Sequence, residues 1–190
     1  MYDAERDPYC YPGSDVLKNK AGLTTAKALE RFETAMTFVR SEEPLPSGRL
    51  SVTHYRAIHH HLFQDVYSWA GRYRTIRISK GDSVFCYPEN IAAQMTRVFG
   101  WLKDGDFLRG RETVNFAKDA AHFLAELNAI HPFREGNGRT QLTFLALLAD
   151  AAGHALDLAK LDASATLGAM IASFNGDEAD LTKIIADLAA

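Results

Sequence analysis

The sequence predicts an all-α fold that carries one β-hairpin. Apolar residues recur at helical spacing through most of the 190 residues, whereas one segment alternates with a period of two. The first pattern is that of amphipathic helices and the second that of a strand. One further stretch is apolar on nearly every side, which is typical of a buried helix. Because no internal repeat interrupts these patterns, we expect one domain over residues 1–190.

The N-terminal part is expected to be an irregular arm followed by two helices. Residues 1–22 are rich in Tyr, Pro, Gly and Asp and predict no regular element. Residues 24–40 have helical spacing, and either Thr24 or Thr25 can cap the helix start. A stretch with two prolines and a glycine then ends the helix. Helical spacing resumes over 52–68.

Residues 71–87 predict the hairpin. Bulky apolar and basic residues alternate over 72–78, residues 80–83 have turn composition, and 84–87 can return as a second strand. Pro88 is suited to the first turn of the next helix. The helices expected after the hairpin span 88–102, 112–130, 142–149 (the apolar, central one), 162–174 and 177–189.

Composition excludes several classes of function. The net charge of −3 leaves no basic stripe for nucleic acid, and no apolar run reaches the roughly 18 residues of a membrane-spanning helix. Cys10 and Cys86 form neither a disulfide framework nor a zinc site, which favours a reduced, cytoplasmic setting. The consecutive histidines 59–61 point in different directions on a helix, so a shared metal ion is not expected there.

The loop 131–139 carries the residues with chemistry. Gly136 and Gly138 bracket Asn137, so the backbone can turn sharply and approach a ligand closely. The N–H groups that open the following helix lack intrahelical partners and, with the helix dipole, form an anion site suited to phosphate. Arg139 adds a fork of donors for phosphate oxygens.

Two further side chains complete this loop. Glu135 is a lone carboxylate beside the expected phosphates, which is a usual way to hold magnesium. His131 can act as a general base near neutral pH. A base, a metal ligand and a phosphate cradle within nine residues indicate phosphoryl or nucleotidyl transfer.

The segment from His131 to Arg139 resembles the Fic-domain signature, H-x-F-x-[D/E]-G-N-G-R-x-x-R. The likeness extends to residues 11–13, 61–71 and 79–81, and it is strongest to short toxin-like Fic proteins and the Fic domains of bacterial effectors. This resemblance implies protein AMPylation, in which AMP passes from magnesium-bound ATP to a Ser, Thr or Tyr hydroxyl of a target protein.

The resemblance also implies roles for individual residues. His131 would deprotonate the target hydroxyl, Glu135 would hold Mg2+, and Phe133 would anchor the loop in the core. The nucleotide would be bound by Gly136, Asn137, Gly138, Arg139, Lys80 and Gly81. The hairpin would be the flap that aligns an extended target segment by strand addition, through Ile78, Ser79, Val84 and Phe85.

One position departs from the signature. Its second arginine would fall at position 142, which is Leu142 here. A charge-assisted contact of this kind contributes about 1.5–3 kcal/mol. Three consequences stay open: weaker but productive ATP binding, another nucleotide donor, or a non-catalytic interaction module that keeps the fold. Arg134 or an arginine within 72–77 is the candidate replacement.

The family's inhibitory helix, [S/T]-x-x-x-E-[G/N], has no match in this sequence. The resemblance therefore implies a small antitoxin that supplies such a helix in trans. It also implies that the chain acts as a toxin or as an effector, and secretion into a host cell stays open.

Overall fold

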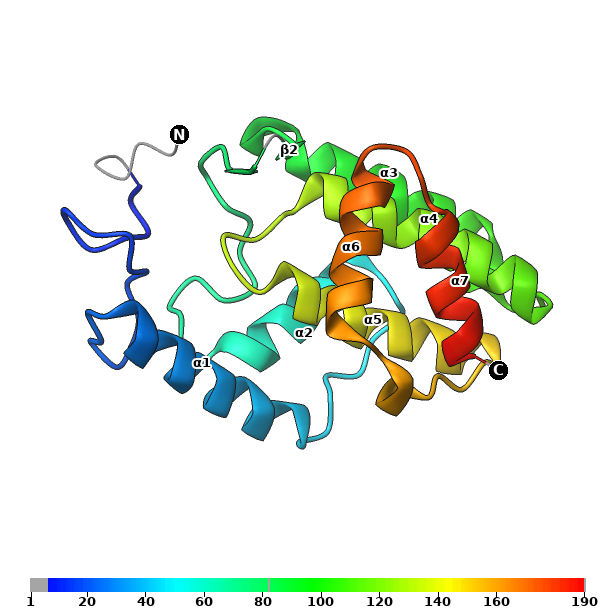
Figure 1. Ribbon diagram of the computed structural model, residues 1–190, viewed down its shortest axis with the longest axis horizontal. Coiled ribbons are helices and arrows are strands. Elements are labelled where there is room, and N and C mark those ends of the chain that lie inside the picture. The colour runs from blue at the N-terminus through cyan, green and yellow to red at the C-terminus, as the bar shows by residue number, and fades with distance from the viewer. Residues whose placement is uncertain (1–6, 82, 190) are drawn as a thin grey trace.

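The structure, a computed structural model, describes residues 7–81 and 83–189. Its α-helices are α1 (Ala26–Ser41), α2 (Val52–Phe63), α3 (Pro88–Asp104), α4 (Thr113–Ile130), α5 (Asn137–Ala152), α6 (Ala163–Phe174) and α7 (Ala179–Leu188). Two 3-10 turns, η2 (Asp106–Leu108) and η3 (Leu158–Lys160), and the strand pair β1 (Ser79–Lys80) and β2 (Ser83–Val84) complete the described elements. The prediction of an all-α fold with one hairpin is confirmed (Figure 1). None of these helices has the length and apolar character needed to cross a membrane.

The helix predicted to be central, α5, shares that position with α4. Helix α4 packs against α3, α5, α6 and α7, whereas α5 contacts α2 and α4 (Figure 1). Alanines at 117, 120 and 121 are fully buried in α4. Small side chains keep the surface of α4 low, so neighbouring helices can approach it on several sides. The two helices are joined by the loop predicted to carry the chemistry.

The starts of the first two helices follow the expected capping chemistry. Thr25 caps α1, since its Oγ1 accepts a hydrogen bond from Ala28 N at 3.4 Å. Helix α2 ends at Phe63, so the predicted end at residue 68 was wrong. The N–H groups of Val66 and Tyr67 both donate to the Phe63 carbonyl in tight turns. Both side chains remain buried, which is why helical spacing continued in the sequence.

The hairpin is much shorter than predicted. Strands β1 and β2 pair antiparallel over two residues each, and residues 72–78 form no strand. The backbone beside the hairpin bonds instead to the end of α4 and the loop after it. Arg74 N donates to Pro132 O at 2.9 Å, and Cys86 N donates to Ala129 O at 3.0 Å. The alternating pattern therefore did not mark a strand, and within 72–78 only Arg74 and Ile78 are buried.

Candidate active site

His131 closes the end of α4 in a left-handed conformation, with φ 47° and ψ 62°. This region is uncommon for residues other than glycine and persists only where the surroundings hold it. Arg74 supplies much of that hold, a role that the sequence analysis did not predict. Its side chain is 2% exposed and donates to the backbone carbonyls of Ile76, Cys86, Ile130 and His131. One guanidinium thus ties the base of the hairpin to the candidate catalytic histidine.

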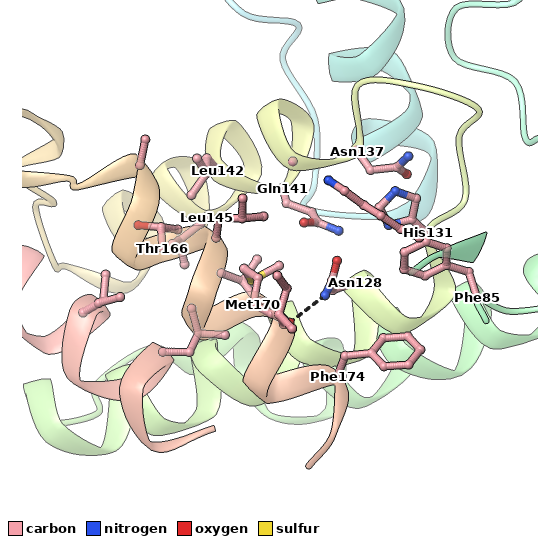
Figure 2. Close-up of a pocket in the computed structure, with 18 of the residues that line it drawn as sticks. Phe85, Asn128, His131, Asn137, Gln141, Leu142, Leu145, Thr166, Met170 and Phe174 are labelled. Carbon is pink, nitrogen blue, oxygen red and sulfur yellow. Dashed lines mark hydrogen bonds between the residues drawn. The ribbon is translucent and has the colours of Figure 1, made fainter. Parts of the chain in front are cut away.

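The His131 ring is set up to stay neutral. It stacks on Phe85, with ring centroids 3.9 Å apart (Figure 2). Burial lowers its pKa to about 4, and the positive charges of Arg74 and Lys80 act in the same direction. The Asn128 backbone acts in the opposite direction and raises the pKa. Nδ1 is buried, which leaves Nε2 as the nitrogen for a substrate. A neutral imidazole is the form that accepts a proton.

The loop between His131 and α5 is fixed from two sides. The Asn137 side chain accepts from Phe133 N at 3.0 Å and donates to Phe133 O at 2.8 Å. Phe133 is fully buried and stacks on His59, with centroids 3.7 Å apart, so the prediction that it anchors the loop is confirmed. His59 accepts from Gly71 N at Nδ1, and its Nε2–H therefore donates to the Glu135 carbonyl at 3.0 Å. His59 thus links Gly71 to the loop and packs against Phe133.

The start of α5 is an open cluster of N–H donors. Gly136 is the N-cap, has φ 82°, and provides no side-chain cap for the first turn. The first N–H groups of a helix have no intrahelical partner and attract anions. Asn137 and Gly138, the first two residues of α5, both line the adjacent cavity. The structure therefore has the open helix start that a phosphate cradle requires, and phosphate binding by residues 136–138 stays a prediction.

Glu135 lies at the mouth of the same cavity. Its Oε1 accepts from Gly136 N at 2.9 Å, and the side chain is 45% exposed. No group of three or more His, Cys, Asp or Glu side chains gathers as a metal site within residues 7–81 and 83–189. A magnesium ion held here would take one carboxylate oxygen from the chain and its other ligands from phosphate and water, which is the usual arrangement for this ion.

The cavity has a volume of about 970 Å³ and lies between the hairpin, α5, α6 and α7. His131, Glu135, Lys80 and Gly81 line one end of it, as predicted for a shared site. Leu142, Leu145 and Met170 lie further along, and this part is largely apolar (Figure 2). The cavity thus has a polar end and an apolar end.

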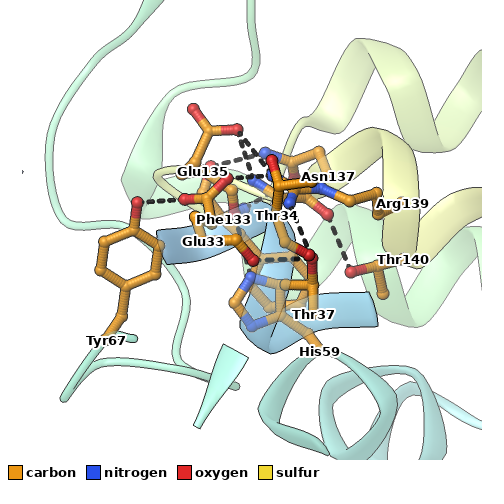
Figure 3. Close-up of polar contacts among 11 residues, drawn as sticks. Glu33, Thr34, Thr37, His59, Tyr67, Phe133, Glu135, Asn137, Arg139 and Thr140 are labelled. Atoms are coloured by element: carbon orange, nitrogen blue, oxygen red, sulfur yellow. Dashed lines mark hydrogen bonds and ion pairs between the residues drawn. The ribbon is translucent and has the colours of Figure 1, made fainter. Parts of the chain in front are cut away.

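Arg139 does not face this cavity. Its guanidinium pairs with Glu33 of α1 and lies 3.3 Å from Thr37 Oγ1 (Figure 3). It also lies over the Phe63 ring, 4.7 Å from the centroid. The other carboxylate oxygen of Glu33 accepts from the Tyr67 hydroxyl. Arg139 Nη2 also lies 3.8 Å from Oε1 of Glu135, the candidate metal ligand. The role of Arg139 as a nucleotide ligand stays a prediction.

The flap residues divide into two pairs. Ser79 is exposed and Val84 is 60% exposed, as a docking surface requires. Ile78 and Phe85 are 8% and 7% exposed, and Phe85 covers the His131 ring. Both side chains line the cavity, and a part for Ile78 and Phe85 in target docking stays a prediction.

The arginines considered as replacements for the missing one are engaged elsewhere. Arg74 is bound to backbone carbonyls, and Arg77 lies over the Tyr87 ring at 3.9 Å. Arg134 lines the cavity but donates to Asp7 Oδ2 at 2.8 and 3.0 Å. The contacts of these side chains give no direct substitute for an arginine at position 142.

The sequence model of the Fic/DOC family matches residues 49–149, which include the hairpin, the loop and most of α5. The chain belongs to the Fic/DOC family. It is 52% identical over 181 residues to the probable protein adenylyltransferase y4lH of Sinorhizobium fredii, covering 95% of this chain and 94% of that protein. It is 35% identical over 187 residues to the protein adenylyltransferase VbhT of Bartonella schoenbuchensis, where it spans 97% of this chain but 39% of the relative. By these relatives this Fic chain is classed among the protein adenylyltransferases.

Solved Fic structures show the same arrangement. The N-terminal Fic domain of the Bep8 effector from Bartonella sp. 1-1C has a TM-score of 0.89 at 25% identity, covering 96% of this chain and 94% of that one. The BepC effector of Bartonella tribocorum, solved with bound AMPPNP, has a TM-score of 0.84 at 26% identity and covers 95% of both chains. The fold therefore matches that of a Fic protein with an ATP analogue bound.

The buried state of His131 gives a pH prediction. Because its pKa is lowered to about 4, the base stays neutral, and the transfer rate should hold from pH 7 down to nearly pH 4. An ordinary histidine would lose activity below its usual pKa of 6.5. Single-turnover transfer rates measured across this range would show the difference, and an acid limb centred near pH 6.5 would contradict the assignment.

Stability must be followed in the same experiment. His59 also has a pKa lowered by burial, to about 3. Below pH 6.5 these two histidines bind protons in the unfolded chain but stay neutral in the folded one. The free energy of unfolding therefore falls as the pH falls towards their folded pKa values. Each histidine contributes about 1.4 kcal/mol per pH unit in that window. Near-UV circular dichroism would mark the pH at which unfolding, rather than protonation of the base, limits the rate.

Proposed function

We propose that this chain transfers AMP from magnesium-bound ATP to a hydroxyl side chain of another protein. One observation carries the proposal: a neutral histidine, a carboxylate and an open helix N-terminus meet at one end of a single cavity. These are the base, the metal ligand and the phosphate cradle that nucleotidyl transfer needs.

The residues divide the work as follows. The donor phosphates would lie against the N–H groups at the start of α5, and Glu135 would hold a magnesium ion, which would offset part of the phosphate charge. His131 Nε2 takes the proton as the target oxygen attacks the α-phosphorus. The bond from that phosphorus to the bridging oxygen breaks, and pyrophosphate leaves with the electron pair.

The target is expected to lie along the hairpin. Both residues of strand β1, Ser79 and Lys80, are exposed. Lys80 and the following Gly81 line the cavity. An extended segment added to the edge of β1 would bring its hydroxyl toward His131. The Bartonella relatives are effectors, which is consistent with a protein target.

Control by an antitoxin helix in trans belongs to the same proposal. Leu167 and Ile171 line the cavity from α6, and each is 52% exposed. This pair offers an apolar surface beside the site for such a helix. A role as a toxin would require such an antitoxin partner. A role as an effector would require a target protein in a host cell.

The function is tested with two labels on ATP. The purified protein is incubated with magnesium and a cell lysate, once with α-labelled and once with γ-labelled ATP. A protein band that takes label from the α-position alone identifies AMP transfer. Label from the γ-position would instead identify a kinase. Absence of label with α-labelled ATP, UTP, CTP and GTP would contradict transferase activity and leave a binding module.

A further inference from the structure

The cavity-lining face of α5 carries no charge. The residues of α5 that line the cavity are Asn137, Gly138, Gln141, Leu142 and Leu145. The arginine of the first turn, Arg139, is not among the lining residues; it pairs with Glu33 of α1 and lies 3.8 Å from Glu135 Oε1 at the start of the helix. An anion on this face is therefore held only at the helix start, and the influence of the dipole falls off after the first turn.

Leu142 makes the second turn of α5 apolar where it lines the cavity. It lies four residues after Gly138, so the two share a face of the helix. Figure 2 shows Leu142 grouped with Leu145 and Thr166, away from His131 and Phe85. Leu161, Ala163 and Leu167 line the same region. The wall that follows the phosphate cradle thus contains no cation among the described residues.

The cations of the cavity belong to its other end. Of the described residues that line it, Lys80 and Arg134 are the basic ones besides neutral His131. Lys80 is on β1, and Arg134 lies in the loop and pairs with Asp7. Lys80 and Arg134 therefore belong to the end of the cavity that contains His131. The proposed function places the α- and β-phosphates at that end. Nothing charged is provided for a third phosphate that extends along α5.

We propose that recognition of the donor ends at its β-phosphate, an inference that rests on the proposed AMP transfer. The chain then accepts nucleoside diphosphates and their esters as donors in addition to triphosphates. The target oxygen attacks the α-phosphorus, and its proton passes to His131. The bond to the bridging oxygen breaks, and that oxygen leaves on inorganic phosphate from ADP or on a phosphate monoester from an ester donor. Leu142 is the residue that determines this specificity.

Calorimetric titration with Mg-ATP, Mg-ADP and AMP tests the proposal. The natural protein should bind ATP and ADP within about threefold of each other and AMP at least about tenfold more weakly. It should also transfer label from α-labelled ADP to protein. Leu142→Arg should shift the balance toward ATP by about tenfold, since it adds a charge-assisted contact for the third phosphate. Leu142→Met, with similar bulk and no charge, should leave the ratio of the two affinities unchanged.

Two outcomes would overturn the inference in different ways. ATP binding more than about tenfold tighter than ADP binding to the natural protein would show that the third phosphate is recognised. In that case AMP transfer would still stand. If neither nucleotide binds, the proposed function fails and this inference fails with it. The ratio measured on the natural protein decides the matter even where Leu142→Arg does not fold.

Discussion

Replacing His131 by asparagine should lower the rate of AMP transfer by about two to four orders of magnitude, which is the usual contribution of a positioned general base. Asparagine tolerates the left-handed backbone that this position adopts, so the loop should keep its shape. The amide cannot accept the proton of the target hydroxyl. Single-turnover transfer of α-label measures the loss, and calorimetry should show an unchanged affinity for Mg-ATP.

The matched control for this variant is His61→Asn. His61 lies on α2 and bonds to the Arg40 carbonyl, far along the chain from the loop. Its replacement should leave the transfer rate within about twofold of that of the natural protein, since surface and peripheral changes rarely matter more. A rate for His131→Asn that matches this control would show that another group, or water, removes the proton.

Replacing Gly136 by alanine should disrupt the loop itself. Its φ of 82° disfavours any residue with a side chain, and an added Cβ would overlap the Phe63 ring. Phe63 is fully buried and stacks on His59, so it has no free space to move into. We expect a loss of about 2–4 kcal/mol in the free energy of unfolding, from overpacking together with backbone strain. Urea unfolding would measure this loss, and transfer should fall to background.

Gly138→Ala, two residues further along, should have the opposite effect on stability. Nothing lies within 4 Å of a Cβ at this position, and the residue is already helical. Alanine should therefore raise the free energy of unfolding, by up to about 1 kcal/mol from helix propensity. Because Gly138 lines the cavity, the methyl group should weaken nucleotide binding. Equal behaviour of the two alanine variants in unfolding and binding would contradict this account of the loop.

The sequence predicted the parts of the site that lie close together along the chain. Residues 131–138 comprise one short loop and the first two residues of α5, so their types and spacing were enough to place a base, a carboxylate and an open helix start together. The helices were placed to within a few residues because their apolar faces follow the 3.6-residue period. The end of α2 was misjudged because buried turn residues continued the same spacing.

The contacts across the chain were not predictable from pattern alone. Glu33 lies 106 positions before Arg139, and nothing in helical periodicity marks it as a partner of the loop. Arg74 is buried, whereas the alternating pattern would have placed the basic residues of this segment on the outward side. A buried arginine must find acceptors, and backbone carbonyls at a helix end provide them. Neither the burial of Arg74 nor its partners followed from the sequence pattern.

The pairing of Glu33 with Arg139 makes the site depend on parts of the chain that are far apart in sequence. The first helix must return to the fifth across 106 positions before the loop has its full support. Contacts between segments so distant in sequence form slowly, because the chain must lose much of its freedom before they can hold. Helices α6 and α7, which come last among the described elements, supply further residues that line the cavity. Truncation before α6 would therefore leave the loop without one wall of its cavity.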